Sequence, residues 1–369
     1  MKLKLRKKLL DFEAKTYASD SIDLPENGVD CFEGCNPYGF PTELYKAKDA
    51  FNIERFAPYP HSNAVLEGLN YFWKGEVELS NDNLMLTDGS VAAIYVINNL
   101  FTQTNGKVLG VAPQFSNFVS YAVLTGAEYD PIYLTRDKNM RINPEEIIDK
   151  LDESYSMVYL DNPNNPTGQI IDIAAIERIL RKADDCGVAV VVDEAYGDLM
   201  PKANSAIRLI GKYSNLIVMR TLSKGFGLAG LRIGYIIASK YLISCMKKMS
   251  NPYQVSEFSR EMAGIALHNP HQMELNMLDF AKEKQEIRAS IHNNLTMAES
   301  YDTVSIFTLF HKNSDVDLKK MFYDHGILCV SGGDFIGTDK SFVRIRLPKN
   351  DEFPVLLSAI KDIDEEITA

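Results

Sequence analysis

The stretch NLIVMRTLSKGFGLAGLRIGYIIAS, residues 215–239, contains two apolar runs on either side of a glycine-rich turn. Lys224 ends the first run, after Thr221 and Ser223, and three glycines follow it within six residues. Small residues let a bulky ligand approach the backbone, and a lysine in a mostly apolar site can form an imine. Thr221, Ser223 and Arg232 are suited to bind a dianionic phosphate. The stretch therefore predicts a reactive lysine between two strands of an α/β domain.

The same alternation of apolar strands and amphipathic stretches extends from residue 84 to residue 240. Near-continuous apolar strands separated by helices are typical of a mostly parallel sheet that is covered on both faces. A smaller α+β unit follows a helical stretch. We therefore expect an N-terminal arm that forms part of the small domain (1–40), a large domain (41–265) and a small C-terminal domain (266–369).

Composition excludes several classes of partner. The net charge of −11 and the pI near 5.2 argue against nucleic acid and anionic membranes. No apolar run approaches the ~20 residues of a membrane span. The basic N-terminus, MKLKLRKKLL, lacks the apolar core of a secretory signal. Five scattered cysteines favour a reducing cytoplasm, and Cys31 and Cys35 have no matching second pair for zinc, so no metal is expected.

Residues just after the strands are the candidate ligand contacts, because ligands bind at the carboxyl ends of strands in α/β sheets. Asp88, Gly89 and Ser90 open a helix whose free N–H groups suit a phosphate, although an ordinary N-cap serine is the alternative. Asp193 follows an apolar run, where a carboxylate needs a partner unless it caps a helix. Phe115 is either a ring-stacking aromatic or a core residue.

Three motifs carry a resemblance to a known family. RTLSKGFGLAGLRIGY (220–235), DNPNNPTGQ (161–169) and VVDEAYGDL (191–199) resemble the signatures of class I/II aminotransferases, and are most similar to histidinol-phosphate aminotransferases. NPYG (36–39) and Tyr59-Pro60 resemble the N-terminal elements of that family, so that the resemblance covers roughly residues 30 to 350. It implies the fold type I of pyridoxal-phosphate enzymes, and pyridoxal 5′-phosphate as the cofactor.

The resemblance also implies roles for individual residues. Lys224 would hold the cofactor as a Schiff base and then move the substrate's α-proton. Asp193 would pair with the ring nitrogen, while Asn165 and Tyr196 would bond the phenolic oxygen; a merely packed tyrosine is the alternative for Tyr196. The expected cofactor-binding set is Tyr59, Gly89, Ser90, Val91, Phe115, Asn165, Asp193, Tyr196, Thr221, Ser223, Lys224 and Arg232.

The segment FVRIRLP (342–348) contains the residues expected to bind the substrate. Arg344 matches the arginine that binds the substrate α-carboxylate in related enzymes, where its planar fork suits a carboxylate. Arg346 shares its strand face and either binds a second acidic group or pairs with a surface acid. Tyr38 and Asn165 complete the expected substrate-binding set.

The family resemblance also bears on the substrate and on the number of subunits. Histidinol-phosphate aminotransferases usually have an arginine for the substrate phosphate where Val330 and Ser331 stand here, and its absence would weaken phosphate binding by ~1.5–3 kcal/mol. Tyr59 resembles a tyrosine that reaches the cofactor phosphate of the neighbouring subunit. We therefore expect a homodimer with shared active sites, and histidinol phosphate is not favoured as the substrate.

The expected activity is transfer of an amino group between an L-amino acid or related amine and a 2-oxo acid. The alternatives on the same scaffold are a decarboxylase similar to threonine-phosphate decarboxylase and an amino-acid racemase. The choice depends on which α-bond stands perpendicular to the cofactor ring, which the sequence does not specify. A non-catalytic domain of a transcription regulator would need a DNA-binding domain, and only about 30 residues precede the first motif.

Overall fold

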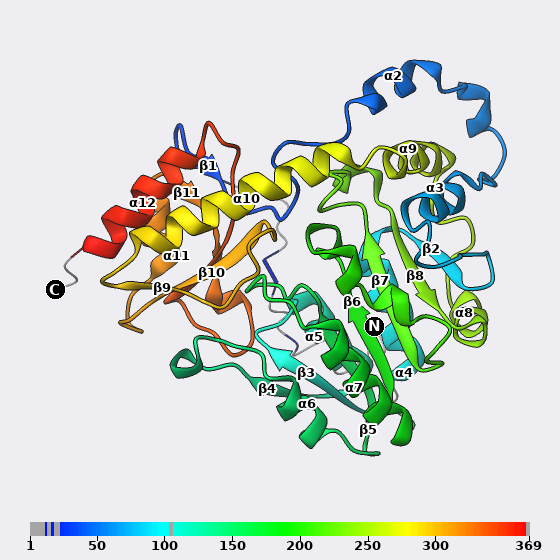
Figure 1. Ribbon diagram of the computed structural model, residues 1–369, viewed down its shortest axis with the longest axis horizontal. Helices are drawn as coiled ribbons and strands as arrows, with labels where there is room; N and C mark the ends of the chain where they lie inside the picture. The colour runs from blue at the N-terminus through cyan, green and yellow to red at the C-terminus, as the bar shows by residue number, and fades with distance from the viewer. Residues whose placement is uncertain (1–11, 13–15, 18–22, 103–105, 367–369) are drawn as a thin grey trace, which may run out of the picture.

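The computed structural model describes residues 12, 16, 17, 23–102 and 106–366, and the basic N-terminal stretch therefore lies outside the described residues. The chain builds a large α/β unit and a smaller unit with an antiparallel sheet (Figure 1). The long helix α10 (His271–Ser290) runs from the large unit across the smaller one. Among the described residues, no helix combines the length and the apolar character that crossing a bilayer requires.

A seven-stranded sheet forms the centre of the large unit, in the order β2-β8-β7-β6-β5-β3-β4. Its strands are β2 (Leu84–Thr87), β3 (Lys107–Ala112), β4 (Glu128–Tyr133), β5 (Tyr155–Asp161), β6 (Ala189–Asp193), β7 (Leu216–Thr221) and β8 (Gly234–Ala238). Only β8 runs antiparallel to its neighbours, β2 and β7. The predicted mostly parallel sheet is confirmed.

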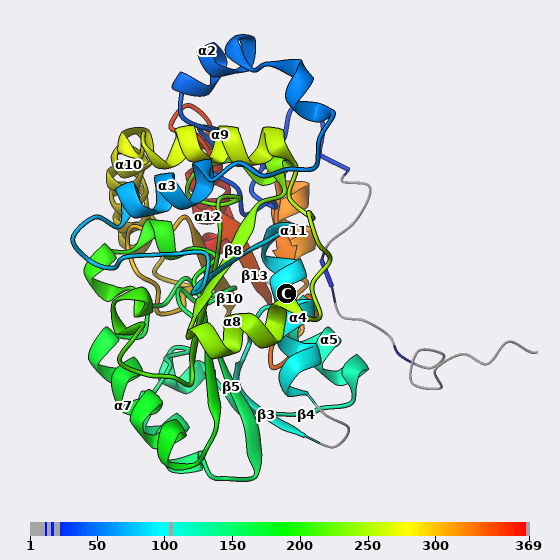
Figure 2. The same ribbon diagram turned by 90° about the vertical axis from the view of Figure 1, so that its right-hand side faces the viewer.

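Helices cover both faces of this sheet (Figure 2). Val190 and Val192 belong to one apolar cluster and Val191 to another, which is the period-two alternation of a strand buried on both sides. The helices of the large unit are α2 (Glu43–Ala50), α3 (Ala64–Phe72), α4 (Gly89–Phe101), α5 (Ser116–Thr125), α6 (Pro144–Lys150), α7 (Ile173–Asp185), α8 (Lys240–Lys247) and α9 (Glu257–Leu267).

The smaller unit contains a four-stranded sheet in the order β12-β13-β10-β9. Its strands and helices are β9 (Leu295–Met297), β10 (Ile306–His311), β12 (Val330–Ser331), β13 (Phe342–Arg346), α11 (Leu318–Asp324) and α12 (Phe353–Glu365). The N-terminal strand β1 (Val29–Asp30) pairs in parallel with β11 (Ile327–Leu328), so the N-terminal segment contacts the smaller unit. The domain boundaries after residues 40 and 265 stay predictions.

Short 3-10 turns complete the described fold. They are η1 (Ile53–Phe56), η2 (Arg136–Lys138), η3 (Gly197–Leu199), η4 (Lys202–Asn204), η5 (Ala206–Leu209), η6 (Ala229–Leu231) and η7 (Gly332–Asp334).

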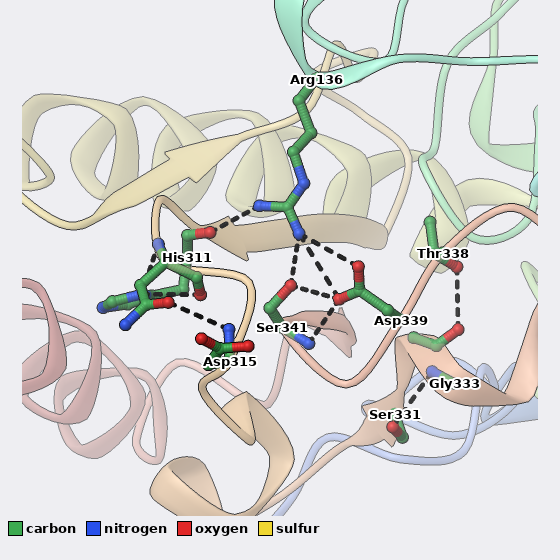
Figure 3. A network of polar contacts seen from close by, with 10 residues as sticks. Arg136, His311, Asp315, Ser331, Gly333, Thr338, Asp339 and Ser341 are labelled. Carbon is green, nitrogen blue, oxygen red and sulfur yellow. Dashed lines mark hydrogen bonds and ion pairs between the residues drawn. The ribbon is translucent and has the colours of Figure 1, made fainter.

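Arg136, in the turn after β4, ties the two units together (Figure 3). Its guanidinium donates to the carbonyl of His311 at 2.6 Å and to the hydroxyl of Ser341. It also pairs with Asp339 at 3.4 Å and lies 4.2 Å from the ring centroid of Phe342. The contact holds the ends of β10 and β13 against the large unit.

Candidate active site

A cavity of about 150 Å³ lies where β5, β6 and β7 end and α4 begins. The predicted site residues that line it are Ser90, Val91, Phe115, Asn165, Asp193, Tyr196, Ser223, Lys224 and Arg232. Parallel strands place their carboxyl ends at one edge of the sheet, which is why residues so distant in sequence meet there. The cavity therefore gathers most of the side chains that the sequence singled out.

Asp193 forms the buried acidic end of the cavity. It is the last residue of β6, and its side chain accepts hydrogen bonds from Tyr159 Oη at 2.5 Å and from the backbone N–H of Ala195 at 2.9 Å. Burial raises the pKa of Asp193 to about 6, against the lowering effect of these bonds and of the Lys224 charge. A cationic partner in the cavity would stabilise the ionised carboxylate.

Lys224 and Tyr196 stand together, with Lys224 Nζ 5.5 Å from the centroid of the Tyr196 ring. The Tyr196 hydroxyl is buried and has no hydrogen-bond partner among the described residues, and burial raises its pKa to about 12. A Cβ at Gly34 would lie 1.9 Å from the Tyr196 oxygen and 3.2 Å from Lys224 Nζ. The N-terminal segment therefore passes so close to both groups that only glycine fits at position 34.

A phosphate-sized anion would find its donors at the N-terminus of α4. Helix α4 begins at Gly89, whose φ of +72° favours glycine, and a Cβ there would lie 2.4 Å from Arg232 Nη2. Ser90 and Arg232 both line the cavity beside the free N–H groups of this helix N-terminus. Thr221 lies behind this wall, where its hydroxyl bonds Ser223 Oγ at 2.9 Å and the carbonyl of Ile233 at 2.8 Å.

Arg344 lies on β13 at the side of the cavity formed by the smaller unit. It is buried, and it donates to Asn165 Oδ1 at 3.3 Å and to the carbonyl of Phe32. Its guanidinium lies 4.6 Å from the ring centroid of Tyr17, whose hydroxyl accepts a hydrogen bond from Asn165 at 2.9 Å. Arg344 Nε has no partner among the described residues. The arginine thus contacts the cavity through Asn165 and Tyr17.

Three predicted residues lie away from this cavity. Arg346 bonds the backbone carbonyls of residues 30, 33 and 347 and pairs with Asp30 at 3.4 Å, which favours the acid-pairing alternative. Tyr38 donates to Asn350 Oδ1 at 2.6 Å. Tyr59 is 70% exposed and stacks on Tyr253, with 4.7 Å between ring centroids.

Tyr17 and Asp161 also line the cavity and were missed by the sequence reasoning. No motif or periodicity surrounds Tyr17, and its aromatic neighbours Phe32, Phe115 and Phe335 are scattered along the chain. Asp161 opens the motif DNPNNPTGQ, and its position at the end of β5, beside Asp193, could have singled it out.

The donors and acceptors of the cavity fit pyridoxal 5′-phosphate. An arginine and a helix N-terminus suit its phosphate, and a buried carboxylate suits its protonated ring nitrogen. The unpartnered Tyr196 hydroxyl suits its phenolic oxygen, and Lys224 offers the amine that its aldehyde requires. A buried donor without a partner is costly, so Tyr196 is better satisfied with the cofactor present.

Comparisons with known proteins agree with this geometry. The chain matches the pattern of the family described as aminotransferase class I and II over residues 38–360. It is 27% identical over 297 residues to the histidinol-phosphate aminotransferase of Ruminiclostridium cellulolyticum, covering 79% of this chain and 80% of that protein. A putative threonine-phosphate decarboxylase of Caldanaerobacter subterraneus is 26% identical over 343 residues, covering 90% and 89%.

The fold also matches solved structures. The crystal structure of the histidinol-phosphate aminotransferase from Clostridium acetobutylicum superposes with a TM-score of 0.80 at 23% identity, covering 92% of this chain and all of that one. The predicted fold type I architecture, a mostly parallel sheet with a smaller α+β domain, is thereby confirmed. This chain belongs to the aminotransferase class I and II family, and it is a pyridoxal-phosphate-dependent transaminase.

Proposed function

We propose that Lys224 binds pyridoxal 5′-phosphate and that the enzyme moves an amino group between an L-amino acid or related amine and a 2-oxo acid. The observation that carries the proposal is that Lys224 and Asp193, from the ends of two neighbouring strands, line one small cavity. An amine and a buried acid that line the same cavity suit two positions of the cofactor ring, which are its aldehyde and its protonated nitrogen.

The bound cofactor withdraws electrons from the substrate carbon that bears the amino group. Asp193 holds the proton of the ring nitrogen through its carboxylate, while Tyr196 Oη and the Asn165 amide donate to the phenolic oxygen. The Lys224 amine would move the proton from the substrate α-carbon to the cofactor carbon that bears the transferred nitrogen, and would move a proton in the opposite direction in the second half-reaction. Arg232, with the N-terminal N–H groups of α4, holds the phosphate and fixes the ring's orientation.

Arg344 would bind the substrate α-carboxylate. Its Nε is a buried donor without a partner among the described residues, and a carboxylate oxygen would satisfy it. Tyr17 covers its guanidinium and accepts from Asn165, so the tyrosine would form the wall against which the substrate side chain packs. These two contacts would orient the α-carbon toward Lys224.

The substrate proposed here carries no phosphate. Val330 is fully buried, and it pairs with Arg344 across β12 and β13 at the place where histidinol-phosphate aminotransferases usually have an arginine. Among the described residues, Lys224 and Arg232 are the cationic side chains that line the cavity, and both serve the cofactor in this proposal. The phosphate of a phosphorylated substrate would therefore have no cationic side chain of the cavity left to bind it.

A decarboxylase or a racemase is the second candidate. The similarity to a putative threonine-phosphate decarboxylase, which extends over 90% of this chain, supports the decarboxylase. All three reactions would start from the same residues around the cofactor.

The enzyme would act as a homodimer in the cytoplasm. Tyr59 is exposed and stacks on Tyr253 outside its own cavity, which leaves it accessible to a second copy, as the resemblance to a tyrosine that reaches the neighbouring cofactor phosphate implies. An apolar groove of about 300 Å³, lined by residues that include Leu44, Leu231 and Phe258, lies beside the glycine-rich turn and suits the same partner. The five free cysteines suit a reducing compartment.

A half-reaction screen tests the activity. Each of the twenty amino acids, histidinol phosphate and phosphothreonine is added singly to the enzyme loaded with cofactor, and conversion to pyridoxamine phosphate is followed by absorbance. Conversion by an unphosphorylated amino acid supports the proposal. Release of carbon dioxide from phosphothreonine, or deuterium exchange with inverted configuration, would support the rival reactions. Faster conversion by histidinol phosphate than by any amino acid would contradict the proposed substrate class.

A further inference from the structure

The cofactor cavity contains a second buried acid beside Asp193. Asp161 ends β5 and Asp193 ends β6, and the two residues are direct partners in the register of these neighbouring parallel strands. Both side chains line the cavity, and each residue is only 4% exposed. The ring nitrogen of the cofactor needs a single carboxylate, which Asp193 supplies, and Asp161 is therefore left without an assigned role.

The two acids differ in their hydrogen bonds. Both oxygens of Asp193 accept bonds, from Tyr159 and from the backbone of Ala195. Asp161 Oδ2 accepts from the backbone N–H of Phe115 at 2.9 Å, whereas Oδ1 has no partner among the described residues. An ionised oxygen without a donor is costly in a buried site, whereas a protonated oxygen is an uncharged donor.

The surrounding charges favour one proton on the pair, because two adjacent buried carboxylates repel each other when both are ionised. Burial, and next the Asp193 charge, raise the pKa of Asp161 well above its usual value, against the lowering effect of nearby donors, which are the backbone N–H groups of Phe115 and Asn165 and the Gln114 side chain. Tyr159 and Tyr129, the titratable groups of β5 and β4 that face it, remain neutral because burial raises their pKa values too. The Lys224 charge lowers the pKa of Asp193. The proton therefore resides on Asp161.

We propose that Asp161 is a positioning residue of the cofactor site that stays uncharged at neutral pH and offers its Oδ1–H to the cavity. Asp193 is then the single carboxylate opposite the ring nitrogen of the cofactor. The inference deepens the proposed function and rests on it for the identity of the bound ring. The protonation of Asp161 itself belongs to the cofactor-free chain and can be tested there.

Urea unfolding of the cofactor-free protein between pH 5 and pH 7 tests the protonation, with wild type compared to Asp161→Asn. The unfolded chain releases the proton of residue 161 above its ordinary pKa near 4, while the folded chain retains it. The unfolding equilibrium constant of wild type should therefore rise by about tenfold per pH unit relative to the variant. The exposed Asp184→Asn is the control and should show a constant ratio. A constant ratio for Asp161→Asn overturns the proposal.

Cofactor binding tests the positioning role at pH 7, by titrating each cofactor-free variant with pyridoxal phosphate and following fluorescence. Asp161→Leu loses both the donor and the acceptor for Phe115, and its dissociation constant should rise about tenfold. Asp161→Asn restores an uncharged donor and acceptor and should recover most of that loss. Equal weakening in both variants would show that a charge is required, and would overturn the proposal. If wild type binds no pyridoxal phosphate, the proposed function fails, while the unfolding test of Asp161 still stands.

Discussion

Replacing Tyr196 by phenylalanine should stabilise the cofactor-free enzyme and weaken its hold on the cofactor. The Tyr196 hydroxyl is buried and unpartnered among the described residues, and an unsatisfied buried donor costs about 1–3 kcal/mol. Removing it should raise the free energy of unfolding of the cofactor-free protein by about 1 kcal/mol or more. The same change deletes the donor proposed for the phenolic oxygen, so the dissociation constant of pyridoxal phosphate should rise by about 10- to 100-fold.

Urea unfolding of the cofactor-free protein and fluorescence titration with pyridoxal phosphate measure the two effects. Tyr159→Phe is the matched control, because its hydroxyl is equally buried but donates to Asp193 at 2.5 Å. That variant should lose about 1–3 kcal/mol of stability, the opposite sign. Destabilisation of the cofactor-free protein by Tyr196→Phe, or a cofactor affinity of the variant equal to that of wild type, would contradict the role proposed for the hydroxyl.

Three further predictions concern buried ionisable side chains. Arg220→Met should lower the free energy of unfolding, measured in urea, by about 3–5 kcal/mol. Arg220 is buried between Glu194 (3.2 Å) and Asp198 (2.7 Å), and its loss leaves both acids without a cation. A decrease below about 1 kcal/mol would contradict this prediction. Arg344→Lys should lower kcat/KM for amino acids by about 10- to 100-fold through loss of the carboxylate fork, and an unchanged value in steady-state kinetics would exclude that role. Burial raises the pKa of Glu283 to about 8, so the folded protein keeps a proton that the unfolded chain loses above pH ~4.5. The free energy of unfolding of wild type should therefore fall relative to that of Glu283→Gln as the pH rises from about 5 to 8. Parallel curves of stability against pH for the two proteins would disprove this prediction.

Much of the large domain could be predicted because its strands are buried on both faces. Such strands are continuous apolar runs, and β6, β7 and β8 are buried along their whole length. Once the sheet is taken as parallel, the residues that follow its strands must converge. That rule alone brings Asp193 and Lys224 to one cavity, and the motifs supplied the expected roles.

The contacts of the N-terminal segment could not be predicted, because no local pattern encodes them. Arg346 shares a strand face with Arg344, as the alternation predicts, yet residues 30–33 cover it and its donors bond their backbone carbonyls. Tyr17 reaches Asn165 across 148 positions of the sequence. Asp161 could be recognised as a cavity residue only once its register with Asp193 was known.

Trapping the cofactor on the protein identifies the lysine that binds it. The enzyme loaded with pyridoxal phosphate is reduced with borohydride and digested, and the modified peptide is identified by mass spectrometry. We expect the pyridoxyl group on Lys224, in the peptide that contains the glycine-rich turn, and no trapping in Lys224→Ala. A pyridoxyl group on another lysine, with Lys224 unmodified, would contradict the assignment of the active site.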